Sequence, residues 1–231
     1  MSNNRFVAFI DISGFKELMR RDKENALKVI RRFFKIGYDI TDPDNGNREK
    51  RIQGLFISDC GVIWSQATEE TEESKLTQFN VILQAVQDIN KGVLDDNLMK
   101  RQNIMLKNSV AYGEFKYIDT QKHDLIRKEM IFGDAYIRAF DDNSMKLDPG
   151  LCRIVIDKKF PEEIKNKIDR NSELDNLSSL IRKKQSKYYF FWNCHSNNEI
   201  NNFWNEYLDS KKDVYKKMYA ALSQNTNLHD N

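Results

Sequence analysis

Cysteine and histidine are scarce in this sequence, and neither residue type forms a recognisable cluster. Of the 231 residues, 3 are cysteine and 3 are histidine. Cys60, Cys152 and Cys194 are odd in number, widely spaced and set in apolar runs, which indicates reduced thiols in a cytosolic protein and argues against a disulfide framework. The histidines have no ligand spacing with one another or with the cysteines, so a zinc site is not expected.

Long apolar segments and a charge imbalance are also missing. No stretch approaches the roughly 20 apolar residues of a membrane helix, and the polar start over residues 1–5 lacks the apolar segment of a secretory signal. We therefore expect a cytoplasmic protein that does not bind membranes. Lys and Arg number 37 against 35 Asp and Glu, a net charge of +2, so no overall field attracts nucleic acid. An anionic ligand must be captured by local groups.

Hydrophobic periodicity predicts an α+β domain of ferredoxin-like order. Apolar β-branched runs predict strands, apolar positions three or four residues apart predict helices, and the elements alternate as β-α-β-β-α-β. The predicted elements are a strand over 5–11, helices between 18 and 39 with a break near 21–22, two strands over 55–64, a helix with its buried stripe over 76–89, a strand over 104–112 continued at 115–118, and a helix from 134 to about 145.

The C-terminal part adds a hairpin and a helix to this domain. Residues 151–156 and 187–192 are expected to pair as strands on either side of a charged helical segment over 161–184. An aromatic helix is expected over 199–222. Because the chain shows no repeat and no flexible linker, we expect a catalytic domain over 1–192 with residues 193–231 packed on it as a helical extension.

Two aspartates follow apolar, strand-like runs. Asp11 ends the first strand, and Asp59 lies in a tight turn between two apolar strands. Carboxylates at adjacent strand ends can hold two divalent cations about 3.5 to 4 Å apart, and hard oxygen ligands suit Mg²⁺ or Mn²⁺. The backbone carbonyl of Ile12 is a natural further ligand because the chain must turn there. Taken singly, however, an Asp at such a position is more often a turn former.

The residues after Asp11 are suited to binding phosphate. Ser13 and Gly14 permit a sharp turn, and a helix is expected to begin at Phe15. Because the first amides of a helix have no partners within it, these three residues are candidates for contacts with the phosphates of a nucleotide.

Five segments, in matching order over roughly residues 5–192, resemble the motifs of class III nucleotide cyclases, the adenylate and guanylate cyclases. Val7–Phe15 resembles their first metal motif, and Phe56–Asp59 resembles the hairpin that carries their second metal aspartate. The next strand of the family is resembled by Ser109–Gly113, and its aromatic-Gly segment entering a helix by Ile131–Ala135. Its late basic hairpin is resembled by Arg182–Phe190. The resemblance implies a nucleoside triphosphate substrate, two divalent cations, Mn²⁺ or Mg²⁺, held by Asp11 and Asp59, and a head-to-tail homodimer whose active sites are shared between protomers.

The positions that would read the base depart from the family pattern. Leu55 and Met130 stand where many adenylate cyclases place a Lys and an Asp that read the purine. Neither side chain can hydrogen-bond an adenine edge. Ile137 and Asp141 stand where the family has an Asn and an Arg, so Arg138 is the nearby cation that can steady the transition state.

Intact metal aspartates with lost purine contacts make the sequence similar to the pyrimidine cyclases of the Pycsar antiphage systems. That resemblance implies conversion of UTP or CTP to the 3′,5′-cyclic monophosphate and pyrophosphate, as a second messenger in antiphage defence, with UTP preferred on family grounds. Arg127 and Lys183 or Lys184 are candidates for triphosphate contacts across the dimer. Two alternatives stay open: a purine cyclase whose base contacts lie elsewhere, and a catalytically silent module that binds nucleotide or dimerises.

Overall fold

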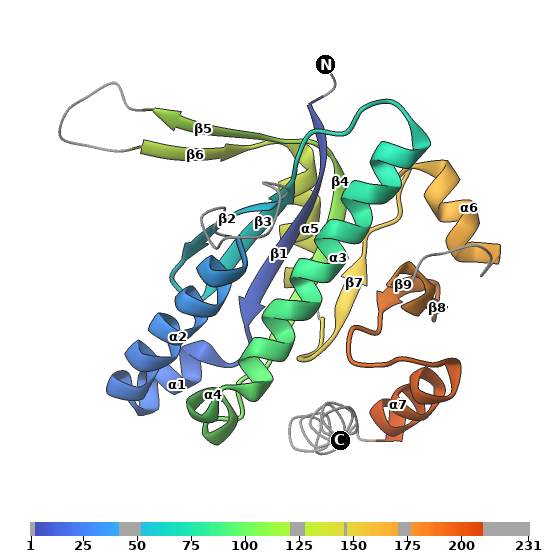
Figure 1. Cartoon of the computed structure of the whole chain (residues 1–231). Helices are drawn as coiled ribbons and strands as arrows, with labels where there is room; N and C mark the ends of the chain where they lie inside the picture. Colours follow the sequence, from blue (N-terminus) through green and yellow to red (C-terminus); the bar gives the residue numbers. More distant parts are fainter. Residues whose placement is uncertain (1–2, 42–51, 121–127, 146, 171–176, 210–231) are drawn as a thin grey trace.

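The computed structural model describes residues 3–41, 52–120, 128–145, 147–170 and 177–209. Within them, helices flank a seven-stranded sheet, and a two-stranded ribbon projects from one end (Figure 1). The strands are β1 (Asn4–Ile12), β2 (Ile52–Ile57), β3 (Cys60–Ser65), β4 (Leu106–Glu114), β5 (Lys116–Thr120), β6 (Lys128–Phe132), β7 (Cys152–Ile154), β8 (Ile181–Lys184) and β9 (Lys187–Phe190). The helices are α1 (Phe15–Arg21), α2 (Lys23–Thr41), α3 (Glu72–Asp95), α4 (Asn97–Arg101), α5 (Asp134–Ser144), α6 (Glu162–Arg170) and α7 (Asn197–Asp209), with a 3₁₀ turn over Ser178–Leu180.

The sheet has the order β2-β3-β1-β4-β7-β9-β8, and β5 and β6 form the separate ribbon. β4 and β7 run parallel, whereas the other neighbouring pairs of the sheet are antiparallel. The predicted β-α-β-β-α-β order is confirmed, with the first helical segment broken between α1 and α2 as expected. β1 lies inside the sheet, which explains why both of its faces are apolar.

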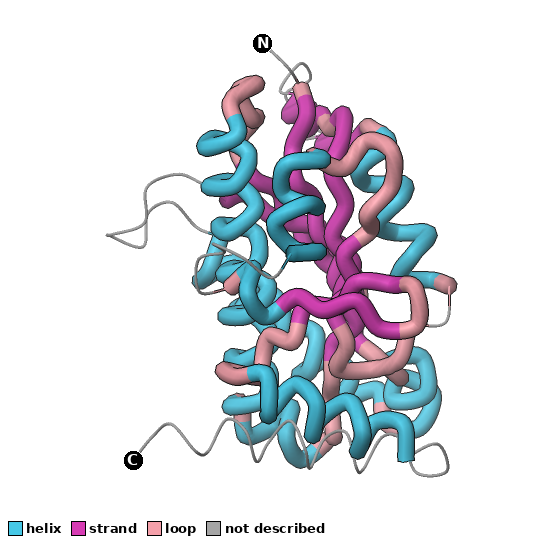
Figure 2. Tube along the Cα trace, turned by 90° about the vertical axis from the view of Figure 1, so that its right-hand side faces the viewer, coloured by secondary structure: helices cyan, strands magenta, loops and turns pink. Residues whose placement is uncertain are grey.

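Alternate residues of β1 enter two different cores, because successive side chains of a strand point to opposite faces. Phe6, Ala8 and Ile10 pack under α2 and α3. Val7 and Phe9 pack on the other face under α5. Seen edge-on, the sheet lies between these two helical layers (Figure 2). Asp11 has the parity of Val7 and Phe9 and therefore belongs to the α5 face.

The prediction of one helical segment over 161–184 was wrong in its second half. α6 ends at Arg170, and residues 181–184 form strand β8, paired with β9. Gln185 and Ser186 both have positive φ, which is the geometry of a two-residue hairpin turn. Periodicity missed the strand because the residues of β8 are mostly charged, whereas the hairpin implied by the family resemblance of Arg182–Phe190 is confirmed by this pairing.

The segment after β4 also differs from expectation. The continuation predicted at 115–118 is a separate strand, β5, and its partner β6 was not predicted. Trp64 of the main sheet packs against Tyr117 of the ribbon, with ring centroids 5.0 Å apart.

α7 begins the predicted aromatic helix. Its Phe203 and Trp204 are buried, and Trp204 packs on Tyr189 of β9. The rest of the predicted helix, from residue 210, lies outside the described residues, and the division at residue 192 stays a prediction. In the described part of the chain, no helix is both long and apolar enough to cross a membrane. All three cysteines are unpaired, as predicted.

Candidate functional site

Asp11 and Asp59 lie at neighbouring positions at one end of the sheet. Asp11 is the cross-strand partner of Cys60, the residue that follows Asp59. The backbone N–H of Ile12 donates to the carbonyl oxygen of Asp59 over 2.9 Å. The charge of Asp59 acts on the pKa of Asp11, so the two carboxylates interact electrostatically. The sequence prediction that these two residues meet in space is consistent with this placement.

A tight turn presents Asp59. Ile57 pairs with Cys60, so Ser58 and Asp59 form a two-residue connection between β2 and β3. Ser58 has φ 56°, a left-handed conformation that turns of this kind require at their first central residue. Because both flanking strands are held in the sheet, Asp59 is fixed relative to β1.

Lys107 neutralises Asp11. The Nζ of Lys107 lies 2.9 Å from Oδ2 of Asp11, and the two side chains are 22% and 23% exposed. They are cross-strand partners on β4 and β1, so both side chains stand on the same face. Burial raises the pKa of Asp11 above its ordinary value, although the hydrogen bond and charge of Lys107 act in the opposite direction. Sequence reasoning missed Lys107; the one signal was that it is the only cation in the predicted strand over 104–112.

The donor set at this end of the sheet consists of hard oxygens. Burial, aided by the charges of Asp59 and Asp11, raises the pKa of Cys60 to about 11, so its thiol stays protonated at neutral pH. The described residues contain no group of three or more His, Cys, Asp and Glu side chains placed to hold a metal. Two carboxylates fit Mg²⁺ or Mn²⁺ where substrate phosphates and water complete the coordination, because Mg²⁺ is usually held in this way. The Ile12 carbonyl stays a prediction.

The turn after β1 has the predicted geometry. Gly14 has φ 74° and precedes α1, and its carbonyl accepts from the N–H groups of Glu17 and Leu18. Ser13 is buried, and its hydroxyl has no hydrogen-bond partner among the described residues. The side chain of Phe15 is buried in the core, so only its backbone can face a ligand.

Leu55 and Met130 lie on different sheets. Leu55 belongs to the α5 face, because it pairs with Val62 and Val62 pairs with Phe9, two residues before Asp11. Met130 lies on β6 and is 49% exposed. Both positions are apolar, as the sequence indicates.

Arg138 is held by its own protomer. Its guanidinium pairs with Asp157 and, at 3.4 Å, with Asp134, and its Nη2 donates to the carbonyl of Tyr112 at 2.6 Å. Tyr112 pairs with Phe6, which lies five residues before Asp11 and hence roughly 17 Å along the strand. Arg138 therefore does not reach the Asp11 site of its own protomer.

Close contact with this arginine explains the neighbouring glycine on β4. A Cβ atom at Gly113 would lie 2.2 Å from Nη2 of Arg138. Gly113 also has φ 157°, which other residues rarely adopt. The strand thus leaves space for the guanidinium, and α5 is anchored to β4 through it.

The two candidate lysines of β8 point to opposite faces. Lys183 lies over the ring of Tyr188, whereas Lys184 lies over the ring of Trp204 and donates to Asn201 of α7 at 3.3 Å. Lys183 also lines a hollow of about 350 Å³ between α6 and β8. A single bound triphosphate cannot meet both from one side of β8. Arg127 lies outside the described residues.

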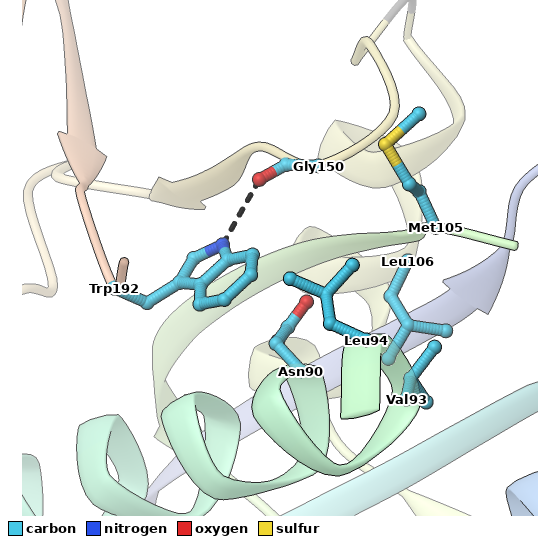
Figure 3. Close-up of a pocket in the computed structure, with 7 residues that line it drawn as sticks. All are labelled: Asn90, Val93, Leu94, Met105, Leu106, Gly150 and Trp192. Atoms are coloured by element: carbon cyan, nitrogen blue, oxygen red, sulfur yellow. Dashed lines mark hydrogen bonds between the residues drawn. The ribbon is translucent and has the colours of Figure 1, made fainter. Parts of the chain in front are cut away.

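A second hollow, drawn in Figure 3, is packed shut. It lies where α3 meets β4, and the indole of Trp192 donates to the carbonyl of Gly150 at 2.9 Å across it. It has no room for a water molecule, so it is part of the core and not a ligand site.

Comparison with known proteins identifies the fold but no sequence family. No family model and no curated protein matches the sequence. Similar solved structures are the dimeric guanylyl cyclase domain of the RhoGC fusion protein from the aquatic fungus Blastocladiella emersonii (14% identity over 81% of this chain and 96% of that chain, TM-score 0.58) and the guanylate cyclase domain of RhGC from Catenaria anguillulae in complex with GTP (13% identity, 81% and 95%, TM-score 0.56). A third is a class III adenylyl cyclase-like ATP-binding protein from Pseudomonas aeruginosa (11% identity, 86% and 40%, TM-score 0.51). The chain therefore has the fold of a class III nucleotide cyclase catalytic domain.

Proposed function

We propose that the protein is a nucleotide cyclase that converts UTP to its 3′,5′-cyclic monophosphate and pyrophosphate. The observation that carries the proposal is the placement of Asp11 and Asp59 on adjacent strands at one end of this fold. Two fixed carboxylates beside a helix-opening turn suit the binding of a metal-complexed triphosphate. The resemblance of the sequence motifs to class III cyclases gives the reaction.

In the proposed reaction, the ribose 3′-oxygen forms a bond to the α-phosphorus while the bond from that phosphorus to the bridging oxygen breaks. Pyrophosphate leaves, and the hydroxyl proton passes to water. Asp11 and Asp59 would hold one or two divalent cations, with the Ile12 carbonyl as a further ligand. When bound, such cations lower the pKa of the attacking hydroxyl and offset the charge of the leaving pyrophosphate. The backbone amides of Gly14 and Phe15 would orient the phosphates, whereas the N–H of Ser13 already donates to the carbonyl of Met105 at 2.9 Å.

The choice of a pyrimidine rests on the apolar positions Leu55 and Met130, and the choice of UTP is supported by Gln53. Gln53 is exposed, two residues before Leu55 on the same face of β2. Its Oε1 accepts from Nε1 of Trp64 at 2.9 Å. Because an indole N–H can only donate, the amide oxygen must face Trp64, which leaves the NH₂ group to donate outward. Such a donor matches O4 of uracil and not the N4 amino group of cytosine.

A homodimer is supported by the exposed apolar residues on and around α5. Phe132 is 61% exposed and Ile137 is 54% exposed, and Phe140 and Met145 follow on the same helix and its end. This helix covers the sheet face that carries Asp11. Exposed apolar residues concentrated in this way are typical of an interaction surface. We propose that a second protomer packs here head to tail, so that Arg138, Leu55 and Met130 of one protomer face the carboxylates of the other.

Two observations favour other readings. The donor of Gln53 also matches O6 of guanine, which favours a guanylate cyclase, and one similar structure contains GTP. The engagement of Arg138 with Asp157 inside its own protomer favours a silent nucleotide-binding module. A guanylate cyclase does not account for apolar residues at both base positions, and a silent module does not account for the presence of both carboxylates with the turn after β1.

Incubation of the purified full-length chain with Mn²⁺ and each of UTP, CTP, ATP and GTP separates these functions. We expect a cyclic monophosphate chiefly from UTP. Turnover of GTP or ATP alone would overturn the pyrimidine assignment, and binding without any turnover would favour the silent module. The antiphage role that the family resemblance implies requires a further test, in which the cyclic product accumulates in the cytoplasm after phage infection.

A further inference from the structure

The side chain of Lys107 supplies the positive charge that pairs with Asp11. Lys107 lies opposite Asp11 in the register of β1 and β4, and its ammonium contacts Oδ2 at 2.9 Å. Both side chains are more than three-quarters shielded from solvent. An ammonium at this distance already occupies one of the carboxylate oxygens that a divalent cation would use.

A divalent cation and Lys107 cannot share Asp11 without repulsion. A cation bound to the carboxylate would lie about 2 Å from its oxygens, next to a positive charge that is only partly screened. A metal ion that uses Oδ2 has to displace the ammonium from that oxygen, and one on Oδ1 is repelled by it. Lysine is suited to this move, because it is a point charge on a flexible four-carbon stem. The other anion beside Asp11 is Asp59, which would itself hold the metal. The anion left to receive the ammonium in a cyclase reaction is the triphosphate, which would lie beside the same carboxylates.

We propose that Lys107 is a tethered counterion that competes with divalent cations for Asp11 and moves onto the triphosphate when the metal–nucleotide complex binds. This inference rests on the proposed function for the identity of the triphosphate, but the competition at Asp11 rests on the ion pair alone. The competition by Lys107 makes metal binding weak in the absence of nucleotide and stronger in its presence. Lys107 thereby couples occupation of the metal site to arrival of the substrate.

The test is a titration of the full-length protein with Mn²⁺ alone, read from the electron paramagnetic resonance signal of free Mn²⁺. Lys107→Met should bind Mn²⁺ at least about tenfold more tightly than the wild type, within the usual range of coupling between two ligands. Lys107→Gln, which can still donate to Asp11, should also bind more tightly, and Lys107→Arg should resemble the wild type. Lys116→Met is the matched control, because it removes the same charge from an exposed pair with Glu114.

A second arm measures the affinity for 3′-deoxy-UTP, which lacks the attacking hydroxyl, at saturating Mn²⁺. Lys107→Met should bind this nucleotide about tenfold more weakly than the wild type and Lys116→Met. Thermal unfolding of each variant confirms the fold, and Lys107→Gln replaces Lys107→Met if the latter does not fold. Adding Asp11→Asn to Lys107→Met should abolish the gain in Mn²⁺ affinity.

The outcomes separate this inference from the proposed function. Unchanged or weaker Mn²⁺ binding by both neutral variants overturns the competition, even if the wild type cyclises UTP. Unchanged affinity for 3′-deoxy-UTP overturns the move onto the triphosphate. A gain in Mn²⁺ affinity in a protein that turns over no nucleotide supports the competition and rejects the cyclase assignment.

Discussion

The backbone N–H of Ile12 donates a 2.9 Å hydrogen bond to the carbonyl oxygen of Asp59. This bond joins the end of β1 to the turn between β2 and β3. Because both strands are already paired in the sheet, the two aspartates are placed by the backbone and not by flexible loops. Sites built on regular elements hold their geometry better than sites on loops.

The turn that carries Asp59 predicts a stabilising substitution. Ser58 has φ 56°, which costs a residue with a Cβ atom about 1 kcal/mol. Ser58→Gly should raise the free energy of unfolding in urea by up to about that amount. Ser58→Ala is the control, because it keeps the Cβ atom and should give no gain. Equal effects of the two variants would show that the backbone conformation is not the cause.

Gln53 predicts a switch in base preference. Gln53→Glu keeps an acceptor for the Trp64 indole but replaces the outward donor by an acceptor. The ratio of kcat/KM for UTP over CTP should fall by about tenfold or more. Gln53→Leu removes the donor without adding an acceptor, so it should slow UTP without favouring CTP. If both variants kept the wild-type ratio of kcat/KM for UTP over CTP, Gln53 would not take part in base recognition.

The exposed residues around α5 predict a dimer. Ile137→Glu should place a charge in the proposed interface and shift the protein to monomer in sedimentation experiments. It should also abolish turnover, because each site of the proposed dimer needs both protomers. Leu27→Glu is the control, since Leu27 of α2 is similarly exposed on the opposite side of the sheet. An active Ile137→Glu monomer would contradict a shared active site.

The pairing of Asp157 with Arg138 predicts a specific acid dependence. Burial acts to raise the pKa of Asp157, but the hydrogen bond from Arg138 and the backbone N–H of Lys159 bring it below its usual value of 3.8. Folding thus favours the ionised form of Asp157. The contribution of this carboxylate to the free energy of unfolding is present above pH 3.8 and is lost as the pH falls through the lower folded-state pKa. Asp157→Asn should cost about 1 kcal/mol at neutral pH, since partial exposure screens the pair, and progressively less in acid.

The control for this acid dependence is Asp39→Asn, which changes a carboxylate in an exposed pair with Lys35. Its effect on the free energy of unfolding should be small. A loss of stability in Asp157→Asn that persists undiminished at the lowest pH would mean that the ionised carboxylate is not what stabilises the fold.

Local pattern predicted the elements that bury one consistent face, and it failed where pairing is set by distant partners. The strand β1 and the helix α3 were predicted correctly, because burial fixes the periodicity of their apolar residues. Periodicity alone assigned β8 to a helix, because Arg182 and its neighbours look like a solvated surface until β9 is beside them; only the family resemblance pointed to the hairpin.

The residues of the candidate site also fall into those that local sequence predicted and those that it did not. Asp11 and Asp59 were found because each interrupts an apolar run. The ion pair of Asp11 with Lys107 depends on the register of β1 against β4, and the pairing of Arg138 with Asp157 depends on how α5 docks. Neither register nor docking is encoded in a single segment, so these contacts could not be read from sequence.

The assignment of Asp11 and Asp59 as metal ligands is tested by comparing UTP turnover by the wild type with turnover by Asp11→Asn and Asp59→Asn. All are measured in Mn²⁺, with cooperative thermal unfolding confirmed for each. Asp39→Asn serves as the control for loss of an exposed carboxylate. Both site variants should lose at least about 10³-fold in kcat, because the metal-supported charge stabilisation is removed from the transition state. A folded Asp11→Asn or Asp59→Asn protein that keeps turnover within a few-fold of the wild type would contradict the assignment of these carboxylates.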